Sequence, residues 1–130
     1  MGIPNGERRR LVLLVEDDVN LRTVTRRLLA KRGFDLIEAG SAAEAYEVVE
    51  AHEGPLDAIL MDINLPDGWG ATVAQRLRLE RPEAVIVYTT GFAKSDPVLD
   101  AALADAEWVI RKPYRGDELA ELLTRAIEEG

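Results

Sequence analysis

The sequence predicts one α/β domain with a doubly wound, parallel five-stranded sheet built from alternating β–α units. Three observations lead to this prediction. Short apolar runs recur along the chain, and each is followed by a segment whose apolar residues repeat at helical spacing. The runs are rich in Leu, Ile and Val, which is typical of strands covered on both faces. The length of 130 residues is that of a single domain.

The five strands are expected at about residues 11–15, 34–38, 57–61, 84–89 and 107–111. The second run has a mixed pattern of Phe34, Leu36 and Ile37, which predicts an edge strand. The third run leads directly into Asp62, and a loop rich in proline and glycine follows. We therefore expect the Asp62 carboxylate at the open end of a buried strand.

Five helices are expected after these strands. They cover about residues 19–32, Ser41 to the breaker residues 52–55, Gly70 to just before Pro82, 97–105, and Asp117 onward. In the first helix, the apolar residues at helical spacing are Leu21, Val24, Leu28 and Leu29. Ser41 and Glu44 form a capping box, and Gly33 follows two cations as a helix stop. Asp117 is expected to cap the last helix.

Composition narrows the classes of function. The chain has no cysteine, so disulfide and thiol chemistry are excluded. Its net charge of −8 argues against direct nucleic-acid binding. No apolar run approaches the roughly 20 residues that cross a bilayer, and no secretory signal is recognisable, so we expect no membrane contact and a cytoplasmic location. Residues 1–10 are expected to form a flexible arm, with Arg8–Arg10 solvated, before a domain at 11–130.

Polar residues follow four of the predicted strands. They are Glu16-Asp17-Asp18, Asp62, Thr89-Thr90-Gly91 and Lys112-Pro113. In a doubly wound sheet, ligands bind beyond the carboxyl ends of the strands, so these side chains are expected to converge. Clustered carboxylates resist joint ionisation, and a divalent cation removes that conflict. Oxygen donors without His or Cys favour Mg²⁺.

A carboxylate beside such an ion can act as a nucleophile and form an aspartyl phosphate. Phosphoryl transfer then depends mainly on positioning and on charge compensation. Lys112 can bind a phosphoryl oxygen as a point charge, and a threonine can donate a hydroxyl hydrogen bond. Asp62 is therefore interpreted as a covalent phosphoryl acceptor.

With these motifs, the span from about Leu11 to Glu129 resembles the receiver domain of two-component response regulators. The motifs that carry the resemblance are Leu13-Leu14-Val15-Glu16-Asp17-Asp18, Met61-Asp62-Ile63-Asn64-Leu65-Pro66, Thr90-Gly91 and Lys112-Pro113. The resemblance implies the flavodoxin-like strand order 2-1-3-4-5. It also implies a phosphate donor, which is a histidine kinase or phosphotransfer protein, and a downstream effector bound through the face of helix 4, strand 5 and helix 5. Because the last helix reaches the end of the chain, no output domain is expected to follow it.

The resemblance assigns roles to single residues. It implies that Glu16, Asp17, Asp62 and the backbone carbonyl of Asn64 bind Mg²⁺. Asp62 would accept the phosphoryl group, Thr90 and Lys112 would hold its oxygens, and the Lys112–Pro113 peptide bond would be cis. Such a domain would catalyse its own phosphorylation and slow dephosphorylation without being a turnover enzyme.

Several positions remain open at this stage. Thr89 competes with Thr90 as the switch hydroxyl, although the Thr-Gly pair and its spacing to Lys112 favour Thr90. Val109 stands where the family often has an aromatic residue, which puts the usual switch in doubt. Asp18 and Asp67 could add metal ligands, but a helix cap and a solvated turn acid, respectively, are favoured.

Two other functions compete with the phosphoacceptor. A phosphatase-like hydrolase with Asp62 as nucleophile usually has an acid two residues later, and this chain has Asn64 there. A pseudo-receiver scaffold would bind partners without phosphate, but no member of the expected pocket is missing. A nucleotide-binding domain of similar fold would need a glycine-rich phosphate loop, which the first strand lacks.

Overall fold

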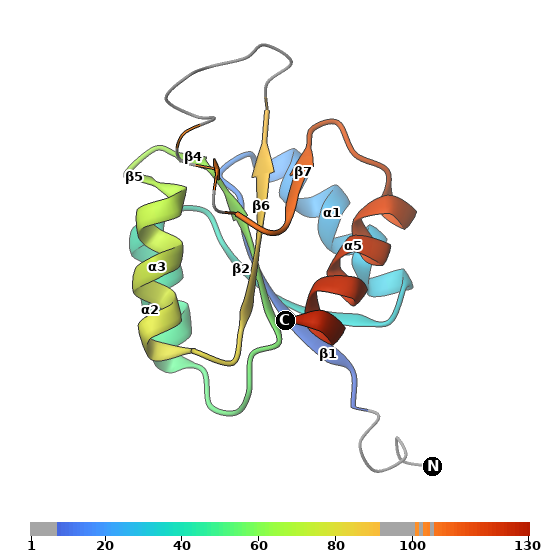
Figure 1. The fold of residues 1–130 in the computed structure, drawn as a ribbon, viewed down its shortest axis with the longest axis horizontal. Coiled ribbons are helices and arrows are strands. Elements are labelled where there is room, and N and C mark those ends of the chain that lie inside the picture. Colours follow the sequence, from blue (N-terminus) through green and yellow to red (C-terminus); the bar gives the residue numbers. More distant parts are fainter. Residues whose placement is uncertain (1–7, 92–100, 102, 105) are drawn as a thin grey trace.

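A parallel five-stranded sheet forms the centre of the protein, and helices cover both of its faces (Figure 1). The computed structural model describes residues 8–91, 101, 103, 104 and 106–130. The strand order is β2-β1-β3-β6-β7. This confirms the predicted order 2-1-3-4-5, because two further short strands, β4 and β5, lie outside this sheet and raise the numbers of the last two.

The elements follow the predicted alternation closely. The sheet contains β1 (Arg10–Val15), β2 (Phe34–Ala39), β3 (Ala58–Asp62), β6 (Val85–Thr90) and β7 (Val109–Arg111). The described helices are α1 (Val19–Lys31), α2 (Ala42–Ala51), α3 (Gly70–Glu80) and α5 (Gly116–Glu129). The helix predicted at 97–105 lies largely outside the described residues. A hairpin of β4 (Asn64–Leu65) and β5 (Gly68–Trp69) was not predicted.

Two apolar clusters hold the layers together. One lies between the sheet and α2 and α3, and the other lies between the sheet and α1 and α5 (Figure 1). Strand β3 is buried along its whole length and contributes alternately to both, with Met61 in the first cluster and Leu60 in the second. The β3 segment is therefore fixed from both sides, and with it the position of Asp62 at its end.

Most of the predicted caps are present. Asp18 caps α1 by accepting a hydrogen bond from the N–H of Leu21 at 3.0 Å. Ser41 Oγ accepts from the N–H of Glu44 at 3.1 Å. The cap predicted at Asp117 is wrong: α5 begins at Gly116 after Arg115, and no side chain caps it. Asp117 lies instead in the first turn, where its charge still favours the helix dipole.

Two details of the core differ from the prediction. Val24 is exposed, and the buried residue on that side of α1 is Thr25. Both residues fit helical spacing, and Thr25 is the one whose hydroxyl group meets that of Tyr114, two residues before α5. Strand β7 begins at Val109 rather than at residue 107, although the carbonyl of Trp108 already accepts a hydrogen bond from the N–H of Tyr88.

The basic run near the N-terminus is bound to the domain. Arg8 forms two hydrogen bonds to the carboxylate of Asp57, at 2.8 and 2.9 Å. Arg9 pairs with Asp35 and Arg10 with Glu128. These three residues were expected in a solvated arm. Arg8 and Arg9 are exposed, and they pair with acids just before β3 and in β2. Arg10 is the first residue of β1 and pairs with an acid in α5.

Substitution of Asp57 by Asn is expected to destabilise the protein by about 1.5–3 kcal/mol at pH 7, the usual range for hydrogen bonds to a charged group. Burial of Asp57 works to raise its pKa, but the Arg8 guanidinium and the Leu11 N–H outweigh this and lower the pKa. The stabilisation is therefore present above the unfolded pKa of about 3.9 and is lost as the pH falls through the lower folded pKa.

Urea unfolding of wild type and Asp57→Asn between pH 7 and pH 2 checks this expectation. The difference between the two proteins should narrow in the acid range. Asp35→Asn is the matched control, since the Asp35 side chain is 56% exposed and such ion pairs contribute at most about 1 kcal/mol. A constant difference across the whole pH range would contradict the prediction.

Candidate acidic phosphoacceptor site

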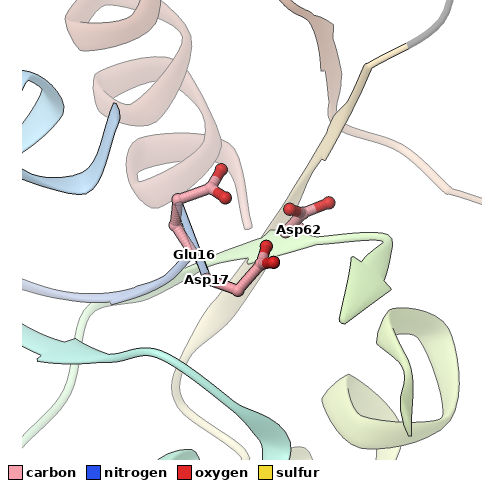
Figure 2. Close-up of side chains that lie close together, drawn as sticks. All are labelled: Glu16, Asp17 and Asp62. Carbon is pink, nitrogen blue, oxygen red and sulfur yellow. The ribbon is translucent and has the colours of Figure 1, made fainter. Parts of the chain in front are cut away.

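Three carboxylates meet beyond the ends of two neighbouring strands. Glu16 and Asp17 follow β1, and Asp62 is the last residue of β3. One oxygen from each of them lies within 4.8 Å of the others, and Figure 2 shows the three side chains gathered at one place. Glu16 and Asp62 are buried, whereas Asp17 is exposed. The predicted convergence of the strand ends is therefore present in the structure.

Lys112 lies between the two buried acids. Its Nζ is 2.6 Å from Glu16 Oε1 and 3.1 Å from Asp62 Oδ2. The cis Lys112–Pro113 bond that the resemblance implies is present directly after β7. Burial tends to lower the pKa of Lys112, but hydrogen bonding to Glu16 and the charge of Asp62 outweigh it and raise the pKa. The ammonium group therefore stays charged beside the two acids.

The surroundings of Glu16 disfavour its charged form. Burial raises its pKa, and the nearby charge of Asp62 acts in the same direction. Hydrogen bonds from Lys112 and from the N–H of Asp18 oppose this effect but do not cancel it. Two buried carboxylates that share one ammonium carry an excess negative charge, which is the condition that a further cation would relieve.

Asp62 is also held from its other side. Its Oδ1 accepts a hydrogen bond from the backbone N–H of Asn64 at 3.0 Å. Asn64 begins the β4–β5 hairpin, where it pairs with Trp69, and its side chain is exposed. Both oxygens of Asp62 thus have a defined partner, and the backbone of Asn64 lies directly next to the carboxylate.

The two threonines at the end of β6 are both buried. The carbonyl of Thr89 accepts from the N–H of Ile63, and that of Thr90 accepts from the N–H of Lys112 at 2.8 Å. The backbone of Thr90 is therefore tied directly to the lysine of the site. Among the described residues, the Thr90 hydroxyl is one of two buried side-chain polar atoms without a hydrogen-bond partner.

Two supports of the site were not recognised in the sequence. Arg22 donates a hydrogen bond to the carbonyl of Glu16 at 2.7 Å and so fixes the loop after β1. Tyr114 and Thr25 are hydrogen-bonded through their hydroxyl groups at 2.9 Å, which ties the segment after Lys112 to α1. The only sequence signal for either contact was that Arg22 and Thr25 are polar residues of the helix that follows β1.

The donor set fits a hard divalent cation. Mg²⁺ in proteins takes one or two carboxylates together with water and phosphate oxygens. Here Asp17 offers an exposed carboxylate beside two buried ones, and no described His or Cys lies in the group. The acidic cluster is therefore a candidate magnesium site by the chemistry of its oxygen atoms.

Comparison with known proteins identifies the family. The model of the response regulator receiver domain family matches residues 12–124. The chain belongs to this family. Receiver domains are signalling modules of two-component systems, so this receiver domain is a signalling module as well. Within the described part of the chain, none of the helices has the length and apolar character needed to pass through a membrane.

Its relatives differ widely in length. The chemotaxis protein CheY of Bacillus subtilis is 28% identical over 117 residues, which are 89% of this chain and 96% of CheY. The sensor kinase CckA of Brucella abortus is 32% identical over 119 residues, 91% of this chain but only 12% of the kinase. The chain also spans half of the aerobic respiration control protein ArcA of Escherichia coli, at 28% identity over 92% of this chain.

Solved structures of receivers have the same fold. The signal receiver domain of an HD domain-containing protein from Pseudomonas fluorescens has a TM-score of 0.82 at 25% identity, covering 94% of this receiver and 97% of that chain. The response regulator TrrA of Thermotoga maritima, in complex with Mg²⁺ and BeF, has a TM-score of 0.75 at 26% identity over 90% of this receiver and 98% of TrrA.

This receiver has a valine, Val109, where the family often has an aromatic residue. Val109, at the start of β7, is half-buried. The neighbouring Trp108 packs against the cluster between the sheet and α5, and the guanidinium of Arg125 lies 5.7 Å from its ring centroid. Trp108 is therefore partly buried against the core at this edge of the sheet and does not take the place of an aromatic at position 109.

Proposed function

We propose that this receiver accepts a phosphoryl group on Asp62 from a phosphohistidine of a histidine kinase or phosphotransfer protein. The observation that carries the proposal is the Lys112 ammonium between Glu16 and Asp62, with the exposed Asp17 beside them. The proposed magnesium ligands are Glu16, Asp17, Asp62 and the backbone carbonyl of Asn64. When bound, Mg²⁺ would neutralise charge on the carboxylates and on the phosphoryl oxygens.

The contacts of Asp62 support its role as the nucleophile. One of its oxygens attacks phosphorus, an O–P bond forms, and the P–N bond to the donor imidazole breaks, with the electron pair leaving on the ring nitrogen. The Asn64 N–H keeps the carboxylate oriented through Oδ1. Lys112, which now touches Oδ2, can pair with a phosphoryl oxygen as the charge moves outward. The same groups would allow self-phosphorylation from acetyl phosphate.

Beryllofluoride with Mg²⁺ tests the proposal on the wild-type protein. We expect beryllofluoride to shift the NMR amide signals of residues 62–64, 90 and 112 only when Mg²⁺ is present, and the two reagents together to shift them further than Mg²⁺ alone does. A receiver that gives no such response would be a scaffold without phosphate chemistry. Sustained hydrolysis of a phosphoester would indicate a hydrolase instead, which is not expected because Asn64 carries an amide where such enzymes use an acid.

The readout is proposed to pass from Thr90 to the face that β7 and α5 share, where an effector would bind. Thr90 and Lys112 are joined by a backbone hydrogen bond, and Lys112 directly follows β7. Val109, Leu122 and Arg125 are among the residues of a groove on this face. A rearrangement at Thr90 on phosphorylation would thus reach that groove through Lys112 and β7.

Substitution of Thr90 by Ala is expected to weaken beryllofluoride binding about ten-fold or more, since hydrogen bonds to charged groups contribute about 1.5–3 kcal/mol. The buried, unpartnered hydroxyl of Thr90 is the group that such a ligand would satisfy. An NMR titration of Thr90→Ala with beryllofluoride at saturating Mg²⁺ measures the loss. Thr89→Ala is the matched control, and if it gave the larger loss, the switch hydroxyl would be Thr89.

A further inference from the structure

Asp67 joins the β4–β5 hairpin to a helix that is distant in the sequence. It lies in the turn of the hairpin, between Pro66 and Gly68, and its carboxylate is exposed. Its Oδ1 accepts from the N–H of Ala42 at 2.7 Å, and its Oδ2 accepts from the N–H of Ala43 at 3.1 Å. Both oxygens thus bind the first turn of α2, and these bonds lower the pKa of Asp67.

This contact adds to a helix end that already has a cap. Ser41 supplies the local cap of α2 through the N–H of Glu44. The carboxylate of Asp67 takes the two N–H groups that Ser41 leaves, and its charge is favourable at a helix N-terminus. Asp67 is therefore neither a metal ligand of the acidic cluster nor a simple solvated acid, the two roles weighed for it from the sequence.

Packing brings the hairpin and α2 together at the same place. Leu65 is buried in the cluster between the sheet and α2 and α3. A Cβ on Gly68 would lie 3.2 Å from Val73 Cγ2 and 3.4 Å from the Cβ of Ala42, so the glycine permits the close approach. The position of the hairpin is therefore set by contacts with α2 and α3 as well as by its own two strands.

The other end of the hairpin touches the acceptor. Asn64, the first residue of β4, donates its N–H to Asp62 Oδ1. Its strand partner is Trp69, which leads into α3. A continuous series of contacts thus runs from the Asp62 carboxylate through the hairpin to Asp67 and the first turn of α2.

We propose that Asp67 is a positioning residue, which holds the β4–β5 hairpin against α2 so that the carbonyl of Asn64 is available to a bound Mg²⁺. This inference rests on the proposed function, because it requires the cation at the acidic cluster. Binding free energies are reciprocal, so a cation that holds Asn64 in place also stabilises the contact between Asp67 and α2. Binding of the cation would then stabilise the contact at the first turn of α2, on the opposite side of the sheet from α5.

Magnesium titrations of the full chain by NMR test the inference, with the shift of the Asn64 amide as the measure of binding. We expect Asp67→Ala to weaken Mg²⁺ affinity roughly ten-fold, the lower end for groups that orient a metal ligand. Asp67→Asn keeps one acceptor oxygen and is expected to fall between Asp67→Ala and wild type. Ser41→Ala is the matched control: it removes a cap from the same helix without touching the hairpin, and its affinity should equal that of wild type.

Hydrogen exchange of the Ala42 and Ala43 amides gives a second readout. Mg²⁺ is expected to slow their exchange in wild type and not in Asp67→Ala. If Asp67→Ala binds Mg²⁺ as wild type does, or if Ser41→Ala weakens binding equally, the positioning role is wrong while the proposed function stands. If the wild-type protein shows no Mg²⁺-dependent shift at Asn64, the proposed function fails, and this inference fails with it.

Discussion

Asp62→Asn is expected to abolish the response of the receiver to acetyl phosphate and to beryllofluoride with Mg²⁺. The amide lacks the anionic oxygen that would attack phosphorus, and it removes one of the three carboxylates within 4.8 Å of one another. Amide NMR spectra and phosphoprotein gels measure the loss, which we expect to be complete. In the absence of metal, the variant should be at least as stable as the wild-type protein. The negative charge of Asp62 disfavours ionisation of Glu16, and the substitution removes that repulsion.

Asp18→Asn is the matched control for this experiment. It makes the same chemical change two residues from Glu16, but Asp18 serves α1 as its cap, and Asn is an equally good cap residue. We expect its response to stay close to that of wild type. A full response in Asp62→Asn would exclude this residue as the acceptor, and a lost response in Asp18→Asn would make Asp18 part of the metal site.

Gly70→Ala is expected to cause the largest loss of stability, about 3 kcal/mol or more, because the added methyl group has no space. A Cβ at Gly70 would lie 2.3 Å from the carbonyl oxygen of Asp62 and 2.7 Å from the Cα of Ile63. Both of these atoms belong to the backbone, which is fixed by β3, so neither can move away as a flexible side chain would. The N–H of Gly70 also donates to the carbonyl of Ile63 at 2.8 Å.

Urea denaturation of Gly70→Ala and of Gly91→Ala measures this effect. A Cβ on Gly91 meets no described atom within 4 Å, and its φ lies outside the left-handed region. The control is therefore expected to change the stability by less than about 0.5 kcal/mol. Equal stability of Gly70→Ala and wild type would mean that the segment between Asp62 and α3 can shift, and the geometry of the acceptor would then be less fixed than described.

The convergence of side chains at the candidate site was largely predictable because one rule of the fold applies to it. Parallel strands end at one edge of the sheet, so polar residues directly after apolar runs must meet there. Asp62 and Lys112 lie 50 positions apart, and their contact at 3.1 Å follows from this rule. The positions at which the apolar runs end, and the polar residues that follow them, were enough to predict this contact.

The hairpin after Asp62 was missed although its turn chemistry is in the sequence. Pro66-Asp67-Gly68 is a turn motif with a physical basis, but strands of two residues have no periodicity that could be detected. The bond from Asp67 to Ala42 could not be predicted in the same way. It depends on which helix end lies opposite the turn, and tertiary packing decides that.

Charge patterns could not show the partners of the basic run for a related reason. Three consecutive arginines near a chain end indicate a solvated arm by composition alone. Arg8 and Arg9 pair with Asp57 and Asp35, and Arg10 pairs with Glu128 at the far end of the sequence. Helical spacing likewise could not distinguish Val24 from Thr25, since the choice between them is made by what α1 packs against.

The ammonium group of Lys112 has a consequence for how this receiver is assembled. It serves as a built-in counter-ion that is present before any cation arrives, so the site does not require metal in order to fold. Small metal-dependent domains are unfolded without their ion, because the free energy of metal binding is what drives their folding. Chelation of the proposed Mg²⁺ should therefore leave this protein folded, with Lys112 still paired to Glu16 and Asp62.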